Sequence, residues 1–214
     1  MPRKHRENTA PPSGLDRLVA FSDGVIAIAI TLLVLDLRVP EVAAELTGDP
    51  GQALENLWPK VLGYVVSFWV IALFWVAHHR CYRYVRQYDR RLIYLNFLFL
   101  MFIAFMPFPT GLLFSSPART LPVILYAGTA AGMGLSLALL WIYAVRHKFI
   151  APEATPAMIR DIRMNLLLPP AVFLLSAIVA LFNAGVAMYV WFLLIPVYVL
   201  RRHLEITVLK EDAP

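Results

Sequence analysis

Six long apolar stretches constrain this chain more than any other feature of its sequence. A helix needs about 20 mostly apolar residues to cross the hydrocarbon core of a bilayer. The stretches that predict spans cover residues 18–37, 57–77, 92–113, 121–145, 162–182 and 186–200. Only 15% of the residues are charged, against about a quarter in ordinary soluble proteins, so the charged shell of a soluble fold is missing. The sequence therefore predicts an all-α polytopic membrane protein with six transmembrane helices.

The two ends of the chain differ from the apolar part between them. Residues 1–15 are polar, basic and rich in proline, and they lack the apolar stretch and cleavage site of a secretory signal. We interpret them as a disordered cytoplasmic tail. Residues 16–206 are predicted to form a single six-helix transmembrane domain, and residues 207–214 a C-terminal cytoplasmic tail.

The positions of the lysines and arginines predict the orientation. All of them except Arg38, Lys60 and Arg119 fall in the two tails, at the start of the first span, or in the second and fourth connections. Cytoplasmic loops are enriched in these residues, so the charges place both termini in the cytoplasm. An even number of spans requires the same result. Topology alone accounts for the basic loops, so we expect no nucleic-acid partner.

The first span contains a polar group of unusual composition. Asp23 lies within it, beside Ser22 and six residues after Arg17. An ionisable residue inside a span is costly and by default indicates a functional site. We therefore expect these groups to face protein or water rather than lipid.

Beyond that group, one face of the same helix allows two interpretations. Gly24, Ile28, Thr31 and Leu35 follow a 4-3-4 spacing and share a face. In the first interpretation this face packs against other helices, and Thr31 bonds back to the carbonyl of Ala27. In the second, several copies of the helix surround a pore. A ring of isoleucines would then exclude water, and a ring of threonine hydroxyls would offer oxygen to a dehydrating cation.

Three motifs in order resemble the transmembrane-protein-175 family, the endolysosomal potassium channels and their bacterial homologues. They are RLVAFSDG over residues 17–24, FWVAHHR over residues 74–80, and LN at residues 95–96 followed by IAFMPFPT over residues 103–110. The resemblance covers residues 17 to about 113 densely. The second half of the chain matches only in its pattern of spans.

The resemblance implies a potassium-favouring cation channel in the inner (plasma) membrane of a bacterium, with no enzymatic activity and no cofactor. Four identical subunits would surround one pore lined by the first helix. Ile28 would form an apolar constriction, Thr31 a polar layer above it, and Leu35 a further apolar layer. No TVGYG-like filter occurs in the sequence. The expected partners are the other subunits, the lipid bilayer and monovalent cations, with no metal beyond permeating potassium.

Polar residues at the predicted cytoplasmic ends of the first three helices form the second candidate site. They are Arg17, Ser22, Asp23, His78 and Asn96. We expect a buried structural network in which Asp23 balances Arg17, since a buried pair fixes geometry more reliably than it adds stability. The other interpretation is a charge in the permeation path or a proton sensor on histidine.

Other functional classes are less compatible with these residues. His78, His79 and Cys81 suggest a metal site, but no further ligands complete a set, which argues against a metalloenzyme. The remaining alternative is a proton-coupled or proton-leak transporter that uses Asp23 and His78, because intramembrane acids and histidines form proton relays.

Overall fold

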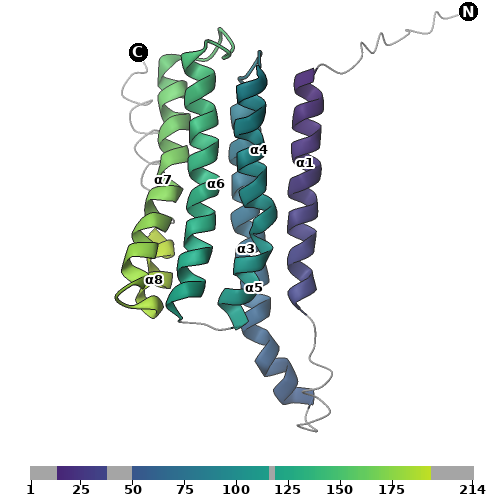
Figure 1. Ribbon diagram of the computed structural model, residues 1–214, viewed down its shortest axis with the longest axis vertical. Helices are drawn as coiled ribbons and strands as arrows, with labels where there is room; N and C mark the ends of the chain where they lie inside the picture. The colour runs from purple at the N-terminus through teal and green to yellow at the C-terminus, as the bar shows by residue number, and fades with distance from the viewer. Residues whose placement is uncertain (1–13, 38–49, 116–118, 194–214) are drawn as a thin grey trace, which may run out of the picture.

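The computed structural model describes residues 14–37, 50–115 and 119–193. Apart from one isolated bridge, these residues form only helices and loops (Figure 1), which confirms the predicted all-α class. In chain order the elements are α1 (Gly14–Leu32), η1 (Leu33–Asp36), α3 (Pro50–Tyr82), α4 (Arg90–Phe105), α5 (Pro107–Ser115), α6 (Thr120–Arg146), α7 (Pro156–Ala180), α8 (Ala184–Val190) and η2 (Trp191–Leu193). The first helix begins at Gly14, inside the predicted tail. The rest of that tail and the C-terminal tail lie outside the described residues.

Five helical segments in the described part of the chain are long and apolar enough to cross a membrane. They are Gly14–Leu35, Leu57–Tyr82, Arg90–Ser115, Thr120–Arg146 and Pro156–Ala180. The third consists of α4 and α5, which are interrupted at Met106 because Pro107 has no N–H to continue the helix. The sixth predicted span, 186–200, begins in α8 and continues outside the described residues.

The centre of the bundle is α6, which packs against α4 on one side and α7 on the other. In its most apolar stretch, 67% of the residues are buried. Two glycines allow the close approach. A β-carbon at Gly132 would lie 2.5 Å from the ring of Phe102 in α4, and one at Gly134 would lie 2.6 Å from the ring of Pro170 in α7. Side chains at these positions would push the helices apart.

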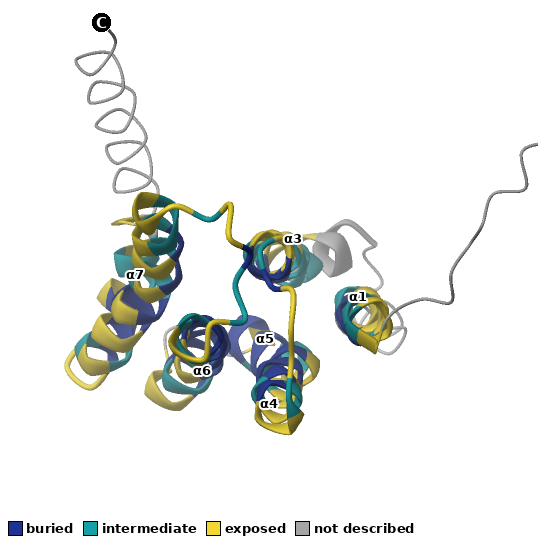
Figure 2. Cartoon of the chain, turned by 90° about the horizontal axis from the view of Figure 1, so that it is seen from above, coloured by how far each residue is buried: buried dark blue, intermediate teal, exposed yellow. Residues whose placement is uncertain are grey.

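The first helix lies at the edge of the bundle, beside α3 and α4 (Figure 2). Only 28% of its most apolar stretch is buried, against 67% for α6. The buried residues form one stripe, Leu18, Ser22, Ile26 and Ala29, at the spacing expected of one helix face. The side of the helix opposite this stripe, which includes Gly24, Ile28 and Thr31, is exposed in the described chain.

Both arginine-rich connections lie at the end of the bundle where α1 begins (Figure 1). They are joined by an antiparallel bridge between Val85 and Ile150. Backbone N–H groups of Arg86 and Ala151 donate to the carbonyls of Phe149 (2.8 Å) and Tyr84 (2.7 Å). The predicted orientation requires these two basic loops to share one side of the membrane, and the bridge holds them together.

Candidate functional site

The outward face of α1 contains the four residues that share the 4-3-4 spacing. Gly24, Ile28, Thr31 and Leu35 are all exposed, with Ile28 at 60% and Leu35 at 53%. The buried stripe of α1 lies on the other side of the helix. Leu35 lies in the 3-10 turn η1, where the helix winding changes, and its side chain is exposed like the other three. Packing against this subunit's own helices does not explain this face.

The hydroxyl of Thr31 donates to the carbonyl of Ile28 at 2.8 Å. The acceptor predicted for the packing interpretation was Ala27, and that assignment is wrong. A threonine hydroxyl in a helix can reach the carbonyl three or four residues back, and here it bonds the nearer one. A hydroxyl has one hydrogen and two lone pairs. The bond occupies the hydrogen and leaves the oxygen able to accept from the exposed side.

Ser22, His78 and Asn96 form a continuous hydrogen-bonded set, hereafter the inner network. All three residues are fully buried. The Asn96 amide Nδ2 donates to Ser22 Oγ at 2.8 Å, and Asn96 Oδ1 lies 2.9 Å from His78 Nε2. Ser22 Oγ donates to the carbonyl of Leu18, also at 2.8 Å. The network joins α1, α3 and α4 through side chains far apart in sequence.

Asp23 and Arg17 are not part of the inner network, which corrects the sequence prediction. Asp23 Oδ1 accepts from the indole N–H of Trp75 at 2.8 Å, and Arg17 is exposed and forms no ion pair with Asp23. Six residues along an α-helix separate two side chains by about 120°. The two groups therefore point in different directions. Trp75 was present in the FWVAHHR motif, but its role as the partner of Asp23 was missed.

A second buried hydrogen-bonded set, the outer network, lies towards the opposite end of the bundle. Thr110 donates to Ser67 Oγ at 2.9 Å or to the carbonyl of Met106 at the same distance, and Ser67 Oγ lies 3.2 Å from the hydroxyl of Tyr126. Tyr126 stacks on Trp191, with ring centroids 4.8 Å apart. The sequence analysis missed Ser67, Thr110 and Tyr126. Each of the three spans also contains other polar side chains, so the sequence carries no signal that groups these three residues.

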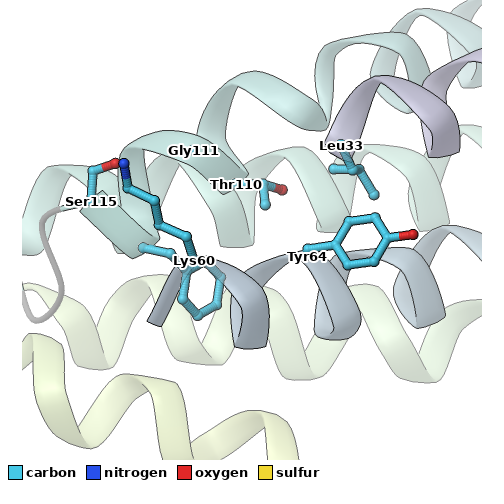
Figure 3. Close-up of a pocket in the computed structure, with 7 residues that line it drawn as sticks. Leu33, Lys60, Tyr64, Thr110, Gly111 and Ser115 are labelled. Carbon is cyan, nitrogen blue, oxygen red and sulfur yellow. The ribbon is translucent and has the colours of Figure 1, made fainter. Parts of the chain in front are cut away.

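A small pocket opens beside the outer network (Figure 3). It is lined by Leu33, Lys60, Tyr64, Thr110, Gly111, Phe114 and Ser115. Residues from η1, α3 and α5 meet here, so the pocket marks where the end of α1 meets two other helices. Within the described ranges no three His, Cys, Asp or Glu side chains gather as metal ligands.

Two polar contacts tie helices together at the end that carries the basic loops. Arg80 and Asp161 form an ion pair at 2.7 Å between α3 and α7. Asp89 accepts the backbone N–H of Leu92 at 2.9 Å, which caps α4, and the hydroxyl of Tyr143 at 2.6 Å. The bond from Tyr143, followed by that from Leu92, lowers the pKa of the Asp89 carboxyl from its usual value.

Comparison with known proteins gives consistent matches. The sequence profile of the endosomal/lysosomal potassium channel TMEM175 matches residues 17–107. A potassium channel of Streptomyces collinus is 42% identical over 147 residues, which are 66% of this chain and 70% of that protein. The crystal structure of a lysosomal potassium-selective channel TMEM175 homolog from Chamaesiphon minutus covers 89% of this chain and 98% of its own, with 32% identity and a TM-score of 0.75. The human endosomal/lysosomal proton channel TMEM175 is 39% identical over 102 residues, 45% of this chain and 20% of that protein.

Proposed function

This chain belongs to the TMEM175 family of ion channels, and on that premise we propose that it forms a potassium-favouring cation channel in a bacterial plasma membrane. Four copies surround one axis, with α1 innermost. The observation that carries the proposal is the exposed face of α1 formed by Gly24, Ile28, Thr31 and Leu35. A subunit whose apolar helix lies at its edge cannot enclose a pore alone, whereas several copies can.

Each layer of the face has a separate physical role in this proposal. A ring of Ile28 side chains forms a constriction that dewets and so blocks hydrated ions. A ring of Thr31 oxygens, with the hydroxyl hydrogens directed to Ile28 carbonyls, offers lone pairs to a cation that sheds water. Leu35 adds an apolar layer where the helix ends. The inner network stays within each subunit and holds α1 from its buried side, opposite the pore-facing residues.

The deciding experiment is single-channel recording in planar bilayers with potassium and sodium on opposite sides. We expect discrete conductance steps in the wild-type tetramer and a higher conductance for Ile28→Asn, which wets the constriction. Leu73→Asn is the matched control, because Leu73 is 62% exposed but lies on α3. If Ile28→Asn left conductance unchanged while Leu73→Asn raised it, α1 would not line the pore.

The threonine layer is tested by Thr31→Val, which keeps the shape and removes the oxygens. We expect the tetramer to persist and the preference for potassium over sodium to fall. An unchanged reversal potential would remove Thr31 from the selectivity mechanism. Mass measurement in detergent that found only monomers would reject the assembly itself.

Proton conduction is the second candidate, favoured by the name of the human relative as a proton channel and by a histidine buried beside α1. A pH gradient without a potassium gradient separates the two. A channel for potassium alone gives no current under that gradient, whereas a proton pathway shifts the reversal potential with pH.

A further inference from the structure

Two buried polar atoms on α3 have no hydrogen-bond partner among the described residues. They are the Nδ1 of His78 and the hydroxyl of Tyr82. His78 is completely buried and Tyr82 is 6% exposed. Buried polar atoms in native proteins are almost always satisfied by protein or by ordered water, so each such atom requires an explanation.

The two side chains are immediate neighbours. They lie four residues apart on one helix, with ring centroids 4.5 Å apart and planes inclined at 41°. The His78 ring also stacks on Phe99 of α4, at 5.3 Å and 9°. The imidazole therefore contacts two aromatic rings, one from its own helix and one from α4.

The inner network fixes which nitrogen of the His78 ring carries the hydrogen. Because Asn96 Nδ2 donates to Ser22, the oxygen Oδ1 is the atom that meets His78. An amide oxygen only accepts, so Nε2 of His78 must carry the hydrogen. In the neutral imidazole Nδ1 is then an acceptor without a donor, and the Tyr82 hydroxyl is a donor without an acceptor. The two unmet requirements are complementary.

We propose that the Tyr82 hydroxyl and His78 Nδ1 hold one buried water molecule between them. The two rings are in contact but their polar atoms share no direct hydrogen bond, and a bridging water is nearly as favourable as a direct bond. Two polar partners are sufficient for an ordered internal water. This water site does not depend on whether ions pass along α1.

The water completes a one-directional series of donors. Tyr82 donates to the water, the water to Nδ1, Nε2 to Asn96, Asn96 to Ser22, and Ser22 to the carbonyl of Leu18. Hydrogen bonds arranged in series polarise and strengthen one another. Tyr82 is therefore a positioning residue that acts on α1 through His78, and it extends the inner network to the cytoplasmic end of α3.

Thermal unfolding of the purified protein tests the proposal, because the Tm of Tyr82→Phe should fall if the water is present and should not fall if it is absent. If a water bridges the pair, Tyr82→Phe removes one of its two partners, and we expect the Tm to fall by about 2–6 °C. If the site is dry, the same change removes an unsatisfied hydroxyl, so the Tm stays constant or rises, and the proposal fails. Tyr94→Phe is the control, because Tyr94 is 68% exposed and its hydroxyl can reach solvent.

A second measurement decides the matter in a protein that retains Tyr82. Replacement of His5, His79, His147 and His203 by glutamine leaves His78 as the single histidine for ¹⁵N nuclear magnetic resonance. We expect hydrogen on Nε2, an Nδ1 shift typical of an acceptor, and rapid transfer of magnetisation from water to the ring. Hydrogen on Nδ1, or no transfer from water, overturns the proposal even if Tyr82→Phe does not fold.

Discussion

The inner and outer networks show that the two ends of the bundle are held in different ways. The inner network joins α1 to α3 and α4 through an amide, an imidazole and a hydroxyl. The outer network joins α3, α5 and α6 through hydroxyls alone and contains no residue of α1. Towards the outer end of the first span, the buried side chains are apolar, such as Ala29 of α1 and Leu33 of η1. The first helix is therefore anchored by directional bonds at one end and by non-directional packing at the other.

This difference matters because hydrogen bonds set orientation, whereas apolar contacts tolerate sliding and rotation. A helix that lines a pore needs a defined rotation, so that the correct side chains face the axis. In the proposed channel, Ser22 supplies that reference through its bond from Asn96. Predictions about single residues follow from the contrast, and they are ordered here by expected effect.

The largest effect is expected for Asn96→Leu, which removes the centre of the inner network. The His78 Nε2–H loses its acceptor inside a buried site, and the total cost is roughly 2–4 kcal/mol. The yield of the proposed tetramer should fall as well, because α1 loses its buried hydrogen bond to α4. Thermal unfolding and size-exclusion chromatography measure the two effects. An unchanged Tm would show that the inner network does not anchor α1.

A smaller effect is expected for Thr110→Val in the outer network. The substitution keeps the shape, and Ser67 and Tyr126 can still bond to each other. We expect a cost of about 1–2 kcal/mol, with assembly retained because α1 takes no part. A loss of tetramer as great as that of Asn96→Leu would remove the distinction between the two ends.

Asp23→Ala tests whether Asp23 lies outside the inner network. The lost bond is the one from the Trp75 indole, which is 39% exposed in the subunit and therefore not fully buried. Because Arg17 is exposed and is not left as a buried unpaired charge, we expect a cost of about 1 kcal/mol. Urea titration of the detergent-solubilised protein can resolve a change of this size. A cost several times larger would mean that Asp23 has a buried partner in the assembled tetramer.

The smallest effect is a pH dependence at the cytoplasmic loop. Because the pKa of Asp89 is lowered in the folded protein, its ionised form stabilises the fold above the ordinary carboxyl pKa of about 3.9. That contribution is lost as the pH falls through the folded pKa. Tyr143→Phe removes the largest cause of the shift, so its Tm should fall less steeply as the pH is lowered below about 4. Parallel curves for the two proteins would exclude this role for Asp89.

Features set by local periodicity could be predicted from the sequence. The exposed face of α1 follows from helical spacing, and the break at Pro107 follows from the missing N–H. The grouping of Ser22, His78 and Asn96 follows from their common depth at helix ends. The pairing of Arg17 with Asp23 was wrong although helical geometry already separates their directions by about 120°.

Features that depend on tertiary contact could not be predicted in the same way. Thr110 and Ser67 are 43 residues apart, and Arg80 and Asp161 are 81 apart. The sequence around a single hydroxyl in a span does not indicate which residue is its hydrogen-bond partner. Which serine meets which threonine depends on the rotation of each helix, and that rotation is set by packing such as the contact of Gly132 with Phe102.

The 3-10 turn at the end of α1 makes the outer part of the helix sensitive to how tightly it is wound. A 3-10 helix advances about 2.0 Å and turns 120° per residue, whereas an α-helix advances about 1.5 Å and turns 100°. Rewinding the four residues Leu33–Asp36 into an α-helix would shorten the segment by about 2 Å and swing its end through about 80°. Since the 4-3-4 spacing aligns Leu35 with Ile28 and Thr31 only on an α-helix, this rewinding would bring Leu35 closer to their line, while Ser22 stayed in place.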